Sequence, residues 1–170
     1  ITAMQNQSII LASGSPRRYQ LLTEAGFEVT VIRPDDEAEQ LANLGNSPEQ
    51  MVANLAQAKA QNVAQQVNSG IVLAGDTLAE LEGQVLGKPR DRAHAKQILQ
   101  TLKGREHRVL SGLCLWKRPE DRVLCQFDQT IVAMRDLADE EIEEYLDSGL
   151  WQGKAGAFGL QDRLGWVQLV

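Results

Sequence analysis

The strongest chemical signal in this chain is the segment LASGSPRR at residues 11–18. Ser15 is a typical N-cap and Pro16 suits the first position of a helix, so a helix is predicted to begin here. Arg17 and Arg18 then lie in the first turn, beside backbone N–H groups that already favour an anion. Positive charge is unfavourable at this end of a helix unless an anion binds. The segment therefore indicates a phosphate site; the alternative is an ordinary helix start with two solvated arginines.

Two further charged residues stand where packing alone explains them poorly. Lys59 falls near the middle of the apolar stripe of a helix predicted over residues 47 to about 67. It either extends its ammonium to the surface or reaches a polar cleft. Asp76 follows the apolar run 71–74, which is typical of a buried central strand. Open α/β sheets bind ligands just outside such strand ends, so Asp76 is a candidate functional carboxylate.

Two weaker signals complete the set of charged candidates. Lys88 adds a cation on the turn Gly87-Lys88-Pro89, and Glu37 adds a carboxylate within an acidic loop. Cations alone could hold phosphate, but carboxylates beside them indicate a hard divalent ion bridging protein and phosphate. The sequence contains neither a G-x-x-x-x-G-K-[ST] loop nor a G-x-G-x-x-G fingerprint. Neither of its two histidines is flanked by a serine or cysteine nucleophile signature, so a hydrolase would use water.

Composition is that of an ordinary globular protein, with 43% hydrophobic and 24% charged residues among 170. The net charge of −6 argues against nonspecific binding to nucleic acid or to an anionic membrane. We find no apolar run long enough to cross a bilayer and no signal segment, so a cytoplasmic location is expected. Cys114 and Cys125 match no metal or redox spacing; they are expected to be reduced core residues, with a neighbour relation across strands as the alternative.

The elements that must position these residues alternate between strand and helix early in the chain. A hairpin is predicted over 78–86, turning at Glu82-Gly83, and a pair of long antiparallel strands over 108–116 and 122–134. The remaining predicted elements are strands at 9–12, 27–32, 71–74 and 166–170 and helices from 16, 47, 91 and 139. This pattern favours a compact α/β or α+β domain.

With these residues in view, the chain resembles the Maf family of nucleoside triphosphate pyrophosphatases, first named for a link to septum formation. The resemblance spans nearly the whole chain. The matching positions, in family order, are 11–18, Glu37, Lys59, 75–77, 86–89 and 154–161. It implies an elongated mixed-sheet α/β fold with a cleft between two lobes, like that of the inosine-triphosphate pyrophosphatases. It also implies hydrolysis of a nucleoside triphosphate to the monophosphate and pyrophosphate with Mg²⁺ or Mn²⁺, and a possible homodimer.

The resemblance also implies roles for individual residues. Asp76 matches the family's catalytic carboxylate, which accepts a proton from the attacking water, and with Glu37 it is a candidate metal ligand. The other polar cleft positions correspond to Ser13, Arg17, Arg18, Lys59, Lys88 and Gln161. Members acting on dTTP and UTP carry Arg, Thr and Gln at the positions of Arg17, Thr77 and Gln161, whereas members preferring 7-methyl-GTP carry Trp, Gln and Glu. This chain is therefore similar to the dTTP/UTP type.

Two departures from the family pattern stand out. Gly75 replaces the usual alanine, a small residue for a small residue. Family members also continue beyond the position of Val170 with a loop, a strand and a helix, so residues 1–170 are expected to form a single Maf-like domain lacking that segment. The alternative functions are a 7-methyl-GTP or broad-specificity pyrophosphatase, and a nucleotide-binding regulator of septum formation with little catalysis.

Overall fold

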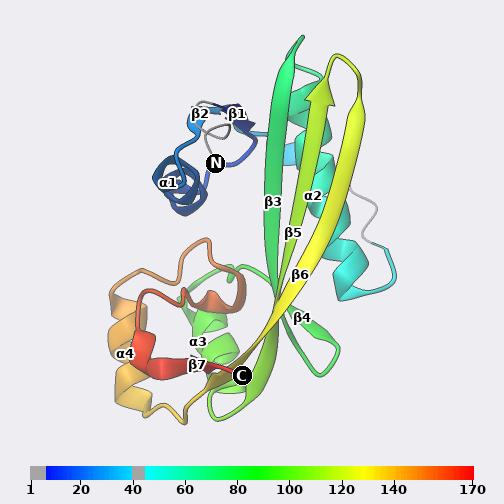
Figure 1. The fold of residues 1–170 in the computed structure, drawn as a ribbon. Coiled ribbons are helices and arrows are strands. Elements are labelled where there is room, and N and C mark those ends of the chain that lie inside the picture. The colour runs from blue at the N-terminus through cyan, green and yellow to red at the C-terminus, as the bar shows by residue number, and fades with distance from the viewer. Residues whose placement is uncertain (1–6, 40–44) are drawn as a thin grey trace. The chain divides into compact units, whose positions relative to one another are not determined.

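A computed structural model describes residues 7–39 and 45–170 of the chain (Figure 1). Over these residues a seven-stranded sheet has the order β2-β1-β3-β5-β6-β7, with β4 paired to β3. β1 is parallel to β2 and β3, whereas the β3–β4 and β6–β7 pairs are antiparallel. The strands are β1 (Ser8–Leu11), β2 (Glu28–Val31), β3 (Gly70–Leu81), β4 (Gln84–Leu86), β5 (Glu106–Arg118), β6 (Arg122–Met134) and β7 (Val167–Leu169). This mixed sheet confirms the predicted fold class.

The helices begin within one residue of the positions that the sequence predicts, 16, 47, 91 and 139. The α-helices are α1 (Pro16–Glu24), α2 (Pro48–Ala64), α3 (Arg92–Leu102) and α4 (Asp139–Asp147), and the first short 3₁₀ helix is η1 (Asp36–Ala38). Ser15, Ser47 and Asp91 each accept a hydrogen bond from a backbone N–H in the first turn of α1, α2 and α3. These side chains satisfy N–H groups that have no partner within the helix, which fixes where each helix starts.

The chain divides into two compact units, residues 1–76 with 111–127 and residues 77–110 with 128–170. In the first unit, α2 lies along the parts of β3, β5 and β6 that belong to this unit (Figure 1). Alanines of α2 and β3 build much of this core. At Gly112 the backbone of α2 approaches so closely that a Cβ atom would lie 2.2 Å from the carbonyl oxygen of Val52. Only glycine allows this approach of helix and strand.

The second unit has its own, larger apolar core. α3 and α4 pack side by side (Figure 1), and α4 buries Ile142, Tyr145 and Leu146, as the sequence predicts. The ring of Tyr145 lies 5.3 Å from that of Trp166 and 5.8 Å from that of Phe158, measured between centroids. Such aromatic contacts add to the stability gained by burying the rings.

Two predictions about local structure are wrong. The strand expected over 71–74 continues through Asp76 to Leu81, where its last residues pair with β4. Cys114 and Cys125, expected to be reduced, are joined by a disulfide. They lie on adjacent strands with Cα atoms 4.1 Å apart, which is the cross-strand neighbour relation that the sequence left as an alternative.

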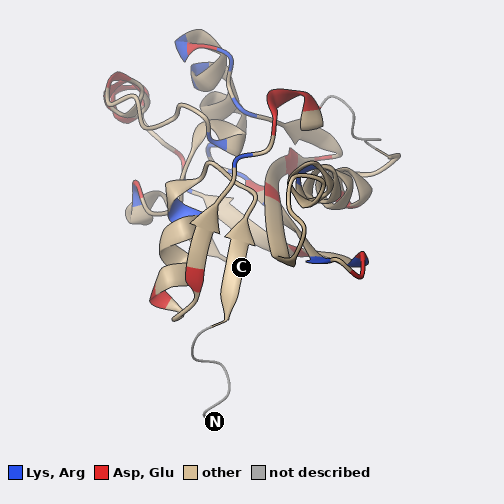
Figure 2. Ribbon diagram, turned by 90° about the horizontal axis from the view of Figure 1, so that it is seen from above, with Lys and Arg blue, Asp and Glu red and all other residues tan. Residues whose placement is uncertain are grey.

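Charged residues of both signs are interspersed along the ribbon (Figure 2). Arg118 at the end of β5, for example, pairs at 2.6 Å with Asp121 in the turn that leads to β6. None of the helices formed by the described residues combines the length and the apolar character needed to cross a membrane.

Candidate functional site

The first unit gathers four of the predicted residues around the end of β1 and the middle of β3. Ser13, Lys59 and Asp76 are each only 6–7% exposed, and Arg18 is half-buried. Buried charged side chains are uncommon unless they are paired or functional, so this cluster differs from the rest of the unit's core.

Ser13 and Arg18 are organised by the turn that follows β1. The Ser13 hydroxyl accepts hydrogen bonds from the backbone N–H of Ser15 at 3.1 Å and from Nη1 of Arg18 at 3.2 Å. The Arg18 guanidinium lies against Gly75, where a Cβ atom would be 3.3 Å from its Nε. Glycine at this position therefore leaves room for Arg18 directly over the strand. Burial lowers the pKa of Arg18, and the negative charge of Asp76 partly offsets that effect.

Lys59 and Asp76 form a buried ion pair. Nζ of Lys59 donates to Oδ1 of Asp76 at 2.8 Å, and the two side chains are 9% and 10% exposed. Lys59 thus points inward from α2 and does not extend to the surface. Burying either charge without a partner of opposite sign would cost several kcal/mol of desolvation, so each group makes burial of the other possible.

A second carboxylate, from Glu39, reaches the same ammonium. Its Oε1 lies 2.8 Å from Nζ of Lys59, and the Glu39 side chain is 49% exposed. The acidic segment is tied to α2 by Asn62, whose side chain exchanges two hydrogen bonds of 3.0 Å with Asp35. The sequence did not single out Glu39, because nothing in the spacing of an acidic run shows which of its carboxylates turns inward.

Arg17 and Glu37 belong to the same unit but differ from this cluster in their exposure. Arg17 is exposed in the first turn of α1, and Glu37 is exposed in η1. Arg17 therefore adds positive charge at a helix N-terminus, where an anion is already favoured. Over residues 7–39 and 45–170, no three His, Cys, Asp or Glu side chains are grouped so that they could hold a metal ion.

The remaining predicted residues lie in the second unit. Thr77 is half-buried on β3, whereas Lys88 and Gln161 are exposed. The turn that carries Lys88 and the segment 154–161 are joined, because the N–H of Gly156 donates to the carbonyl of Gly87 at 3.2 Å. Asp162, next to Gln161, is fixed by the Tyr145 hydroxyl at 2.9 Å and by the Lys154 ammonium.

The model of the family described as Maf-like protein matches residues 8–170. This chain belongs to the Maf family. It is 46% identical over 165 residues to the dTTP/UTP pyrophosphatase of Rhodopirellula baltica, covering 96% of this chain and 72% of that protein. It is 40% identical over 157 residues to the dTTP/UTP pyrophosphatase of Dictyoglomus turgidum, covering 92% and 81%.

Among solved structures, this Maf protein is similar to a HAM1 protein from Coxiella burnetii. The TM-score is 0.50 at 18% sequence identity, over 75% of this chain and 73% of that one. At this level of identity the likeness concerns the fold, and it agrees with the mixed α/β class predicted from the sequence.

Proposed function

We propose that this Maf protein is a nucleoside triphosphate pyrophosphatase that hydrolyses dTTP and UTP to the monophosphate and pyrophosphate. Family membership and 46% identity to a dTTP/UTP pyrophosphatase support the reaction class. The observation that carries the proposal here is the buried cluster of Arg18, Lys59 and Asp76 beside the LASGSPRR turn. Its two cations can offset the negative charge of a triphosphate, and its carboxylate can accept a proton from water.

In the proposed reaction, water attacks the α-phosphorus and pyrophosphate leaves. Arg17, Arg18 and Lys59 offset the negative charge of the triphosphate, with Lys88 as a further cation. Asp76 accepts the proton of the attacking water. Fixed charges aimed at the transition state are the main source of rate in phosphoryl chemistry, and the ion pair with Lys59 holds Asp76 in place before substrate arrives.

A divalent ion fits this proposal by the chemistry of its donors. Mg²⁺ is commonly held by one or two carboxylates together with substrate phosphates and water. Asp76 and Glu39 are the two carboxylates that share Lys59, and Glu37 in η1 remains the further predicted ligand. Bound Mg²⁺ or Mn²⁺ would supply Lewis-acid stabilisation of charge on the phosphate oxygens. The proposed role is clearance of triphosphates from the cytoplasmic nucleotide pool.

The test is pyrophosphate release from a panel of dTTP, UTP, the other common triphosphates and 7-methyl-GTP, with Mg²⁺, with Mn²⁺ and with EDTA. We expect dTTP and UTP to react fastest and EDTA to abolish release. Preference for 7-methyl-GTP would overturn the proposed substrate. Slow release without preference would instead favour a nucleotide-binding regulator.

The proton acceptor is tested by Asp76→Asn, with the exposed Asp128→Asn as the matched control. Loss of a general base typically lowers the rate by about 10²–10⁴-fold, so turnover should fall by that range while nucleotide binding persists. Equilibrium binding and single-turnover rates separate the two effects. Turnover equal to wild type in Asp76→Asn contradicts the mechanism.

Base selection is tested by Gln161→Ala, with the exposed Gln152→Ala as the control. If Gln161 pairs with thymine or uracil, its loss should reduce kcat/KM for dTTP and UTP by about 1–3 kcal/mol and change purine triphosphates much less. An equal loss for every base would mean that Gln161 only shapes the site.

A further inference from the structure

A further cation, Arg33, lies against the turn that follows β1. A Cβ atom at Gly14 would be 3.5 Å from Nε and 3.7 Å from Cζ of Arg33, so the guanidinium lies close over this glycine. Arg33 follows the end of β2, whereas Arg18 reaches Ser13 from α1. Two guanidinium groups from different elements therefore meet consecutive residues of the same turn.

The backbone on either side of Arg33 is restrained. The N–H of Ile32 donates to a carbonyl of β1 at 3.1 Å, which continues the pairing of β2 with β1. Pro34 disfavours a helical conformation at the residue before it. Asp35 then exchanges two hydrogen bonds of 3.0 Å with Asn62 of α2. Arg33 is therefore held next to the turn although its side chain is exposed.

No described residue holds the Arg33 guanidinium in an ion pair or a hydrogen bond. The two short segments outside the described part of the chain contain no Asp or Glu. The neighbouring Asp35 is bonded to Asn62 instead, and Glu28, at the other end of β2, accepts a hydrogen bond from the Ser8 hydroxyl. Arg33 is therefore a positive charge at the turn that no carboxylate of the described chain pairs with.

Three arginines are thus concentrated at one turn of a chain whose net charge is −6. Arg17 and Arg18 lie in the first turn of α1, at the positive end of the helix dipole, and Arg33 adds a third positive charge. Like charges this close repel one another. An anion with several phosphate groups offsets that repulsion by accepting hydrogen bonds from more than one arginine.

Arg33 and the proposed proton acceptor lie on opposite sides of β1. The strand order is β2-β1-β3, and β1 is parallel to both neighbours. Their registers, continued by two residues, set Ser13 level with Arg33 on one side and with Gly75, which precedes Asp76, on the other. Neighbouring strands are about 4.8 Å apart, so about 10 Å separates β2 from β3. A phosphate attacked beside Asp76 therefore leaves Arg33 to the phosphates farther along the substrate.

We propose that Arg33 binds the two terminal phosphates of the substrate, the group that leaves as pyrophosphate. Because Asp76 meets the attacking water only in the proposed reaction, this role rests on the proposed function. A guanidinium suits it, since its planar array of N–H groups donates two parallel hydrogen bonds to phosphate oxygens. Arg33 then contacts pyrophosphate but not the nucleoside monophosphate.

The experiment compares Arg33→Gln with wild type by isothermal titration calorimetry in the presence of Mg²⁺, with pyrophosphate and UMP as separate probes. Arg33→Gln should weaken pyrophosphate binding by about tenfold, because a charge-assisted hydrogen bond is lost. Binding of UMP, which lacks the terminal phosphates, should be unchanged and shows that the variant is folded. Arg122→Gln, which removes an exposed arginine of the same unit, is the matched control and should bind both as wild type does.

Pyrophosphate release from UTP separates this role of Arg33 from the proposed function. The kcat/KM of Arg33→Gln for UTP should fall by about tenfold. Wild-type values of pyrophosphate affinity and kcat/KM in Arg33→Gln overturn the proposal and leave the proposed function standing. Wild type that does not bind pyrophosphate, or an equal loss of UMP affinity in Arg33→Gln, overturns it as well. Wild type that releases no pyrophosphate, but binds it through Arg33, overturns the proposed function and retains the pyrophosphate site.

Discussion

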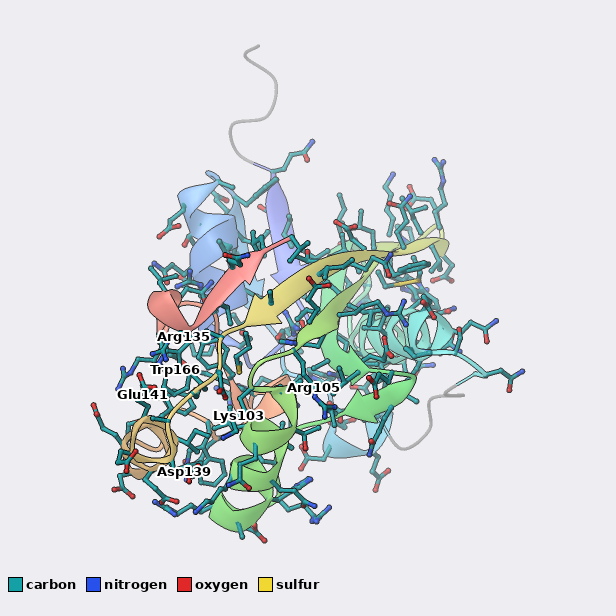
Figure 3. All side chains as sticks on the ribbon, turned by 90° about the horizontal axis from the view of Figure 1, so that it is seen from below. Lys103, Arg105, Arg135, Asp139, Glu141 and Trp166 are labelled. Atoms are coloured by element: carbon teal, nitrogen blue, oxygen red, sulfur yellow. A yellow bond between two sulfur atoms is a disulfide. The ribbon has the colours of Figure 1, made fainter. Side chains whose placement is uncertain are left out.

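The two units bury the two partners of their ion pairs to different degrees. In the first, the Lys59–Asp76 pair is buried, with both side chains at most 10% exposed. In the second, the buried carboxylate of Glu80, 5% exposed, pairs with Arg108, whose side chain is 31% exposed. Other pairs there lie at the surface, where Lys103 pairs with Asp139 and Arg135 with Glu141 (Figure 3). Exposed pairs of this kind contribute little, whereas breaking a buried pair is costly.

This difference indicates which ion pair marks the candidate functional site. A surface pair can be exchanged with little consequence, so its presence says little about chemistry. A buried pair carries a desolvation cost that hydrophobic residues of similar size would avoid. That the first unit keeps one on α2 and β3, next to Arg18, is the physical reason for assigning the chemistry to this cluster.

The largest effect is expected from Lys59→Met. The variant leaves the Asp76 carboxylate buried without its partner, which should lower the free energy of unfolding by about 3–5 kcal/mol and abolish turnover. Urea denaturation measures the first and pyrophosphate release the second. The matched control is Lys117→Met, which breaks the exposed pair with Glu120 in the same unit.

The double variant Lys59→Met/Asp76→Leu sharpens this prediction. With both charges replaced by apolar side chains, most of the lost stability should return while turnover stays absent. Stability that remains as low as in the single variant would mean that packing of the lysine stem, and not the unpaired charge, causes the loss.

A much smaller effect is expected from Arg92→Ala. Arg92 lies 2.6 Å from both Glu143 and Asp147, and its hydrogen bonds to Asp147 and Glu143 raise its pKa, but its side chain is 45% exposed. Solvent and salt screen such a group. The melting temperature should fall slightly in low salt and match wild type in high salt. A drop that persists in high salt would contradict the surface assignment.

The smallest effect concerns the pH dependence of the Arg135–Glu141 pair. The hydrogen bond from Arg135, followed by that from the Ala138 N–H, lowers the pKa of Glu141 from 4.5 to about 2. A depressed carboxyl pKa contributes stability that is present above pH 4.5 and lost as the pH falls through about 2. Urea denaturation of wild type and Glu141→Gln across this range should show that small difference disappear, with Glu140→Gln as control.

Sequence reasoning located the elements well because their signals are local. Caps such as Ser15 and Ser47 and the apolar faces of α3 and α4 fix helices through contacts within a few residues. The same holds for the turn at Glu82 and Gly83, whose positive φ angles of 51° and 86° suit a tight hairpin.

What the sequence did not predict depends on contacts between distant segments. The need for glycine at position 112 arises from the backbone of α2, far earlier in the chain, at Val52. The disulfide depends on the register of β5 against β6, and the inward turn of Glu39 depends on the side chain of Asn62 holding Asp35. None of these relations leaves a pattern within a short window of sequence.

The continuation of β3 through Asp76 also has a consequence for hydrogen exchange. An amide in the middle of a 12-residue strand exchanges only through extensive opening of the fold, whereas Glu39 follows a three-residue 3₁₀ helix that can open locally. We expect the Asp76 amide to exchange far more slowly than that of Glu39. In the proposed reaction, we therefore expect Glu39 to be the carboxylate that leaves Lys59 when a phosphate binds, while Asp76 keeps its position.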